Sequence, residues 1–202
     1  MTDLALIPPD ISMALAHDGL RFALASAPVL IDSATGDEVR RALIADYYAH
    51  VLAGLEVHHH GEEELLFPLL IERFPDERER VDLGTKQHHA VVSYVAAAET
   101  AVSEWGAKSD GECKDVVSAL AALEEVLLVH LDYEQAEIVP VEARLSSEDR
   151  GIYIARTQEH HMARLAPVAE FFFSLYHGQP LLWEAVGEAP FREMLANVRA
   201  SG

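Results

Sequence analysis

The sequence predicts an all-α fold, an up-down-up-down four-helix bundle with an additional C-terminal helix and tail. Three observations lead to this prediction. Long stretches place apolar residues at the spacing of one helical face, and runs of alternating β-branched residues, which are typical of strands, are few. Clusters of Pro, Gly, Asp and Ser divide the chain into segments of helical length. We expect the bundle over residues 1–145 and a helical extension packed on it over residues 146–202.

These breaks locate the expected helices in order. Asp10 follows two prolines and is a good N-cap, so the first helix should begin there and end at about residue 27. The stretch "PVLIDSATGDE" that comes next predicts a loop because it is rich in Pro, Asp, Ser and Gly. The other helices are expected over residues 37–72, 77–105, 112–144 and 147–177, the last capped by the serines of "LSSEDR", with a short helix around "PFREMLANV" in the tail.

Composition excludes several classes of protein and of site. The net charge of −19 argues against nucleic-acid binding, which needs clustered Lys and Arg. No run of about 18 uncharged apolar residues is present and the N-terminus lacks a signal peptide, so we expect no membrane contact and a cytoplasmic location. Cys113 is the only cysteine, which excludes an internal disulfide and a Cys-based metal site. Any metal must be held by His, Asp and Glu.

A repeated stretch carries the most specific signal in the sequence. "VHHHGEEELLFP" (57–68) aligns with "VHLDYEQAEIVP" (129–140), and both contain HxxxE with Pro six residues after the Glu. The first copy alone allows three pairings of its histidines with its glutamates. Because the second copy has a single histidine, His130, which pairs with Glu134, the equivalent pair in the first copy is His58 and Glu62.

The spacing within each pair suits metal binding. Residues four apart on a helix are about 6 Å apart along the axis and point in nearly the same direction, so one His and one Glu can bind the same ion. In an up-down-up-down bundle the second and fourth helices run parallel, which brings the two carboxylates to one level from opposite sides. Two converging carboxylates are what the bridging of two metal ions requires.

Single histidines on the first and third helices could complete such a site. His17 lies on the apolar face of the first helix, three residues before Leu20. On the third helix His88 shares an apolar face with several valines, whereas His89 lies on a more polar face, so His88 is favoured and His89 is the alternative. His160 lies 72 residues after His88, but a four-helix site has no place for a fifth helix unless the first is displaced.

These motifs together resemble the hemerythrin-like (HHE) cation-binding family over residues 10–145. The first helix offers a His, the second HxxxE with "LFP", the third a His after Gln, and the fourth HxxxE with Pro. The resemblance implies a four-helix bundle around a non-haem di-iron centre, with two oxo- or hydroxo-bridged iron ions that bind oxygen-derived ligands. Carried over to this chain, His17 and His58 would bind one iron, His88 and His130 the other, and Glu62 and Glu134 would bridge them.

Two departures from the family pattern matter. Oxygen-carrying hemerythrins have a second His four residues after the third-helix His, where this chain has Val92 or Ser93, and they have HxxxxD on the fourth helix, where this chain has HxxxE. One histidine ligand is therefore missing unless His59 replaces it, as the residue after the second-helix His does in some family members. Fewer protein ligands leave more positions for water, peroxide or oxygen, which points away from simple reversible oxygen carriage.

The expected ligand set also indicates the metal. Imidazoles with bridging carboxylates favour iron, and after it manganese, over a four-coordinate structural zinc. A ferritin-like site needs ExxH on two helices, and only Glu56 to His59 fits. We expect a protein that binds or reacts with oxygen or peroxide, with peroxide disproportionation or the reduction of a small oxidant as the candidate enzymatic activity. The alternatives are a module that binds or senses oxygen, iron or nitric oxide without turnover, and a bundle without metal, which would leave six buried ionisable groups without counter-ions.

Overall fold

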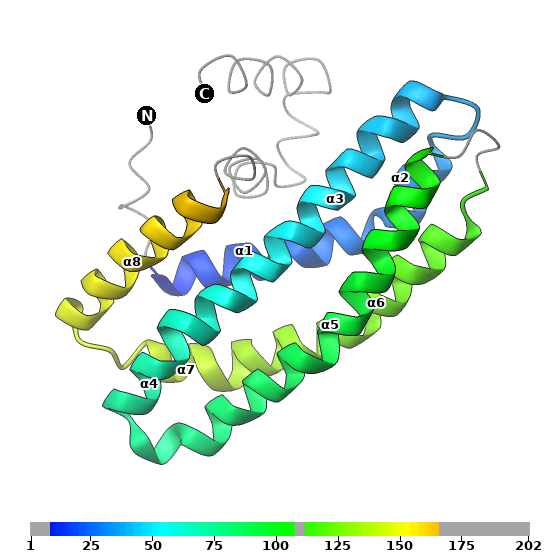
Figure 1. The fold of residues 1–202 in the computed structure, drawn as a ribbon. Coiled ribbons are helices and arrows are strands. Elements are labelled where there is room, and N and C mark those ends of the chain that lie inside the picture. The colour runs from blue at the N-terminus through cyan, green and yellow to red at the C-terminus, as the bar shows by residue number, and fades with distance from the viewer. Residues whose placement is uncertain (1–8, 108–111, 166–202) are drawn as a thin grey trace.

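The computed structural model describes residues 9–107 and 112–165. Within them the protein is all-α, as predicted, and contains no strand. Four long helices form an up-down-up-down bundle, in which α3 and α6 run parallel to each other (Figure 1). Each helix packs against two of the others, in the ring order α1, α3, α5 and α6. These helices are α1 (Pro9–Ala25), α3 (Glu38–Gly61), α5 (Arg78–Ala107) and α6 (Lys114–Tyr133).

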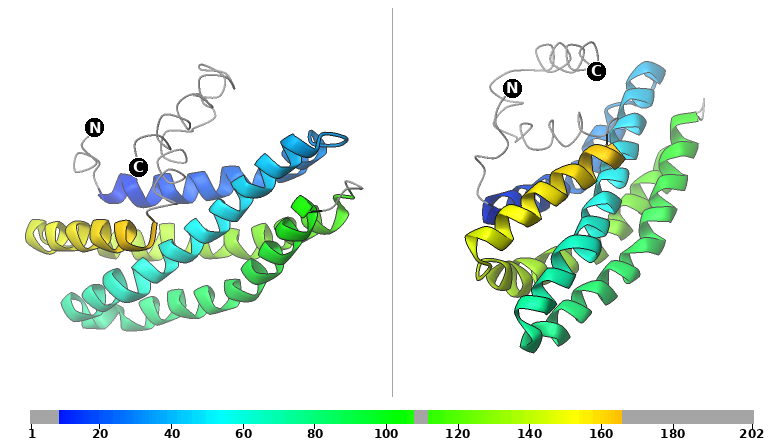
Figure 2. Two further views of the ribbon diagram at one scale, coloured as in Figure 1. Left: turned by 45° about the horizontal axis from the view of Figure 1, so that its top comes forward. Right: turned by 60° about the vertical axis from the view of Figure 1, so that its left-hand side comes forward.

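Shorter elements extend and connect the long helices. Two single-turn π-helices continue α3 and α6, and each is followed by a short α-helix, so the two long rods keep their direction (Figure 2). The short elements are α2 (Ala27–Asp32), η2 (Glu62–Leu66), α4 (Phe67–Arg73), η3 (Pro75–Glu77), η4 (Glu134–Ile138) and α7 (Val139–Glu142). The expected helices over 37–72 and 112–144 therefore exist as composite helices.

One local prediction was wrong. The segment after Ala27 is helical rather than a loop, because Pro28 occupies the first turn of α2, where its missing N–H costs nothing, and Ile31 is buried in the core. The loop is confined to the following turn, where Gly36 adopts a positive φ of 75°. The third helix was expected over residues 77–105, and α5 ends close to that bound, at Ala107. A Cβ at Gly106 would lie 2.8 Å from the Cβ of Ala45, so this glycine permits a close approach to α3.

The π-turns occur at the same position in both copies of the repeat. Glu62 begins the first and Glu134 the second, and in each the N–H five residues later donates to the carbonyl of that Glu. Pro68 and Pro140 stand two residues after the last residue of each π-turn, and a proline ring would clash with the carbonyl four residues before it in a regular α-helix. The wider turn relieves this clash, and π-turns of this kind are frequent at functional sites.

Apolar side chains fill the bundle on both sides of a polar layer. The larger cluster includes Leu55, Val91 and Leu127, and the smaller one includes Leu66 and Ile138. The residues between them on each long helix are the histidines and glutamates singled out in the sequence. The sequence therefore embeds one band of ionisable groups in an otherwise apolar core, where unpaired charges would be costly.

A further helix, α8 (Ser147–Leu165), lies outside the ring and packs against α3 and η2 (Figure 1). The hydroxyl of Ser146 accepts a hydrogen bond of 3.0 Å from the N–H of Asp149, which is the capping that the sequence predicted. The division into a bundle over 1–145 and an extension over 146–202 stays a prediction. The rest of the fifth helix to residue 177 and the tail helix lie outside the described residues. None of the helices in the described ranges is long and apolar enough to cross a membrane.

Candidate metal centre

The structure brings the six predicted ligands together in the middle of the bundle. The first group has one donor atom from each of four side chains, and these atoms all lie within 4.8 Å of one another. The second group meets the same condition and shares two carboxylates with the first. The first group is His17, His58, Glu62 and Glu134, and the second is Glu62, His88, His130 and Glu134.

The shared carboxylates lie between the two groups. Oε1 of Glu62 is 3.5 Å from Nε2 of His58, and its Oε2 is 3.4 Å from Nε2 of His88. Glu134 places Oε2 at 3.3 Å from Nε2 of both His17 and His130, and Oε1 at 3.4 Å from Nε2 of His88. One oxygen of Glu62 therefore faces each group, as a bridging ligand requires.

These contacts have the geometry of ligands around a common point rather than of hydrogen bonds. All of the facing atoms are buried, and within the part of the chain that the structure describes none of them has a hydrogen-bond partner, including both carboxylate oxygens of Glu62 and Glu134. Two ligands of one ion, each bound at about 2.1 Å and separated by 90° to 110°, lie about 3.0–3.4 Å apart. The observed separations match this spacing. A cation between the atoms would satisfy groups that are otherwise costly to bury.

His59 joins the second group. Its side chain is 8% exposed, and it forms a further three-donor cluster with His88 and His130. Its ring stacks on that of His88, with centroids 4.0 Å apart and an interplanar angle of 13°. Nε2 of His59 is buried and has no partner among the residues described. His59 is therefore the candidate to replace the third-helix histidine that the family pattern has and this chain lacks.

The pKa shifts show how the centre is charged without a cation. Burial and the neighbouring Glu134 raise the pKa of Glu62 to about 8. Burial alone would lower the pKa of His88, but the facing carboxylates of Glu134 and Glu62 raise it to about 10. Burial and the neighbouring histidines hold the pKa values of His58 and His59 well below the usual range. Protons on Glu62 and His88 therefore supply positive charge that a metal ion would bring.

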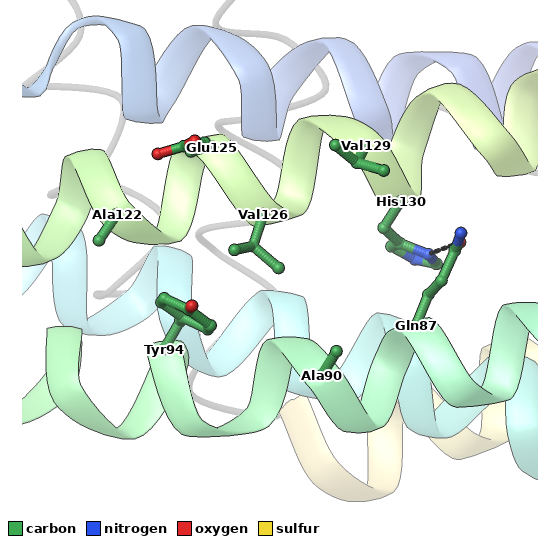
Figure 3. A pocket seen from close by; sticks show the side chains of 8 residues that line it. All are labelled: Gln87, Ala90, Tyr94, Ala122, Glu125, Val126, Val129 and His130. Atoms are coloured by element: carbon green, nitrogen blue, oxygen red, sulfur yellow. Dashed lines mark hydrogen bonds between the residues drawn. The ribbon is translucent and has the colours of Figure 1, made fainter.

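Two side chains bond to the outer nitrogens of candidate ligand histidines. Nδ1 of His88 donates to Oε1 of Glu63 at 2.9 Å, and Nδ1 of His130 donates to Oε1 of Gln87 at 3.3 Å. Such partners fix the orientation of a ligating imidazole and its tautomer. The Gln87–His130 pair lies at one end of a mainly apolar groove of about 500 Å³ between α5 and α6, with Tyr94 toward the other end (Figure 3).

Two rings, those of His59 and Phe67, stack on the ring of His88. Phe67 packs against it with centroids 5.4 Å apart and an interplanar angle of 18°, on α4 directly after the π-turn. Gly84, one turn before His88, makes room for this ring, because a Cβ there would lie 3.2 Å from Cζ of Phe67. The proline, the π-turn, the phenylalanine and the glycine thus act together on the position of one histidine.

Other candidate histidines lie elsewhere. His89 is exposed on α5, since it is turned about 100° from His88 around the helix axis. His60 is exposed and its Nδ1 donates to the carbonyl of Glu56. The side chain of His160 lies outside the described residues. Of the alternatives raised by the sequence, His59 joins the candidate site and His89 does not.

Several features of the centre do not follow from the sequence reasoning above. The two π-turns were not predicted, although Pro six residues after each Glu is a signal for them. Glu63 and Gln87 were not assigned to particular histidines, because sequence spacing does not show which side chains meet across helices. The role of the ligand candidates as metal ligands stays a prediction.

Comparison with known proteins agrees with this geometry. The family model described as the hemerythrin HHE cation binding domain matches residues 13–141. No curated protein and no solved structure matches the chain. The matched range covers well over half of the sequence and includes every histidine and glutamate of the two groups. The chain belongs to the hemerythrin HHE cation-binding family, as its motifs indicated.

Proposed function

We propose that this protein is a non-haem di-iron protein that binds and reacts with dioxygen or hydrogen peroxide. The observation that carries the proposal is the pair of four-donor groups that share both carboxylates. His17 and His58 would hold one ion, and His88 and His130, with His59 as a further donor, would hold the other. Glu62 and Glu134 would bridge the two ions.

The donor set fits iron. Every donor is an imidazole nitrogen or a carboxylate oxygen, and two positions with shared carboxylates exceed what a closed four-ligand zinc site uses. Imidazole also suits copper and nickel. A donor set that combines imidazoles with bridging carboxylates favours iron, and after it manganese. Bound iron would supply Lewis acidity and electrons for reaction with an oxygen-derived ligand.

The protein contributes positioning and exclusion of water. The apolar clusters above and below the polar layer keep bulk solvent away from it. The first group offers two imidazoles and the second offers three, so the position at His17 and His58 has more room for a small ligand. We therefore propose that oxygen or peroxide binds on the α1 side of the centre. This small ligand is the only partner we propose.

The proposed activity is the disproportionation of hydrogen peroxide, in which two molecules yield two of water and one of dioxygen. It requires no external electron donor, because one peroxide is oxidised while the other is reduced. The test begins with metal content and the optical spectrum of protein purified without added metal or chelator. Two irons per chain, with near-ultraviolet bands that respond to peroxide, would support the di-iron assignment.

Oxygen evolution then separates turnover from binding. Holoprotein should evolve oxygen from peroxide faster than an equal amount of free iron, and Glu134→Ala protein treated in the same way should not exceed free iron. Evolution no faster than that of free iron would exclude the catalytic proposal. One bound zinc, or no metal at all, would exclude the di-iron proposal as a whole.

The second candidate is a binding or sensing module that binds oxygen, iron or nitric oxide without turnover. The packing of α8 on α3 and η2 favours it, because these segments carry His58, His59 and Glu62. A change in ligation there could be transmitted to α8. This candidate predicts spectral change with oxygen or nitric oxide, together with altered protease sensitivity of α8, in the absence of peroxide turnover.

A further inference from the structure

The two metal positions differ in the support that their histidines receive. At the second position, the carboxylate of Glu63 accepts a hydrogen bond of 2.9 Å from Nδ1 of His88. The neutral amide of Gln87 accepts a longer one, 3.3 Å, from Nδ1 of His130. At the first position, Nδ1 of His17 is buried and has no hydrogen-bond partner among the described residues. The charged partner is therefore found on one side of the centre.

The repeat shows why this difference is built into the chain. Glu63 lies in the first π-turn, directly after Glu62, so that adjacent carboxylates point to the centre and to the outer edge of His88. Gln135 is the equivalent residue in the second copy, directly after Glu134. Gln135 is neutral and exposed, and no residue in the described ranges bonds to Nδ1 of His17 on the neighbouring α1.

A carboxylate on the outer nitrogen of a ligating imidazole has two physical effects. It locks the tautomer that leaves Nε2 free for the metal, and it draws positive charge toward Nδ1–H, which makes Nε2 a stronger donor. A stronger donor stabilises the more highly charged ion. An amide also orients the imidazole, but it strengthens Nε2 as a donor only slightly, since it carries no net charge.

We propose that Glu63 is a positioning residue that makes the two metal positions unequal. Through His88 it strengthens binding at the second position, so that this position is filled before the one at His17 and its ion is the harder of the two to reduce. This inference rests on the proposed function only in that both require two metal ions at the centre.

A purely local role for Glu63 predicts something different. The side chain is 32% exposed, and an ion pair at such a site contributes little to folding stability. A local role would change the stability of the metal-free protein slightly and would leave the two metal affinities and the reduction potentials unchanged. Metal affinity and reduction potential, rather than activity, therefore distinguish the two roles.

The experiment compares three full-length variants with the unaltered protein. Glu63→Gln keeps a hydrogen-bond acceptor and removes the charge, and Glu63→Ala removes both. Glu64→Gln is the matched control, because it removes one negative charge from an exposed neighbour on the same π-turn. Anaerobic titration with Fe²⁺ gives the two binding constants, and spectroelectrochemistry of the loaded protein gives the potentials.

The proposal predicts a graded result. Glu63→Ala should weaken the tighter of the two Fe²⁺ binding steps by roughly 10–100-fold, which is the usual effect of removing such a partner. Glu63→Gln should weaken it less and shift the reduction potential upward, whereas Glu64→Gln should change neither by comparable amounts.

Equal effects of Glu63→Gln and Glu64→Gln would overturn the proposal, since they would show only the loss of nearby charge. Unchanged affinities in Glu63→Ala would also overturn it, while two ions bound to the unaltered protein would leave the proposed function intact. An unaltered protein that binds no Fe²⁺ would instead overturn the proposed function and this inference together. Thermal unfolding of each metal-free variant identifies any that fail to fold, and for these Glu63→Asp replaces Glu63→Ala.

Discussion

Glu62 and Glu134 begin equivalent π-turns on two parallel helices, and an oxygen of each lies 3.4 Å from Nε2 of His88. The two carboxylates are 72 positions apart in the chain (62 and 134) and share both candidate ligand groups. The centre is therefore organised around the carboxylates, and the histidines surround them from four helices.

Replacement of either carboxylate should remove the capacity to bind two ions together. Glu134→Ala takes away donors from both groups at once, because its two oxygens face His17, His88 and His130. Metal analysis after loading with Fe²⁺ measures the result. His60→Ala is the control, since His60 is exposed and bonds to the backbone of its own helix. Full loading of the Glu134→Ala protein would contradict the bridging assignment.

His59 should contribute to one position only. In the second copy of the repeat Leu131 stands in its place and is fully buried, so His59→Leu introduces a side chain that the fold accepts at the equivalent site. We expect one of the two binding steps to weaken more than about tenfold, or about 1.4 kcal/mol, and the other to change little. His89→Leu serves as the comparison. Equal affinities in both variants would remove His59 from the ligand set.

The stability of the metal-free protein should fall as pH rises, whereas that of the metal-loaded protein should change little. The folded-state pKa of His88 is raised from 6.5 to about 10 and that of Glu62 from 4.5 to about 8, so the folded protein holds protons that the unfolded chain releases. Both contributions are present at low pH and are lost as pH rises through the folded-state values.

The metal-free protein should therefore lose stability between about pH 6.5 and pH 10, as measured by thermal unfolding. Metal replaces these protons, so its binding should release protons and tighten as pH rises. A loaded protein should hold its unfolding temperature over the same range. Identical pH profiles for the metal-free and loaded forms would show that these two groups do not hold the protons assigned to them.

Replacement of Gly84 by alanine should destabilise the protein relative to the same replacement at Gly151. A Cβ at Gly84 would meet the buried ring of Phe67 at 3.2 Å, whereas one at Gly151 would meet no described residue within 4 Å. Helix propensity favours both changes by roughly 0.5–1 kcal/mol. We expect Gly84→Ala to be about 1–3 kcal/mol less stable than Gly151→Ala in chemical denaturation, because overpacking is added to the first change alone. Equal stabilities would mean that the ring moves freely.

Much of the centre follows from the order of the residues alone. His58, Glu62, His130 and Glu134 follow from the repeat, because four residues make about one turn of any α-helix. His17 was identified because it lies on the apolar face of the first helix. His88 was favoured over His89 because it lies on the apolar face of the third helix, and the burial of His88 agrees with this choice.

Other features required the packed molecule. Glu63 and His88 meet across helices, and the stacking of His59 on His88 depends on the angle and depth at which α3 and α5 pack. The helical conformation of residues 27–32 was missed because the burial of Ile31 outweighed the turn-forming composition of the stretch.

The sequence by itself determined the helices, the apolar faces and the polar band, because these depend on periodicities that each helix carries alone. Tertiary structure decided which nitrogens and oxygens meet, that His59 lies beside His88 and His130, and that a carboxylate rather than an amide faces the outer nitrogen of His88. Such relations depend on distances of a few ångströms between helices, which packing sets and no single helix encodes.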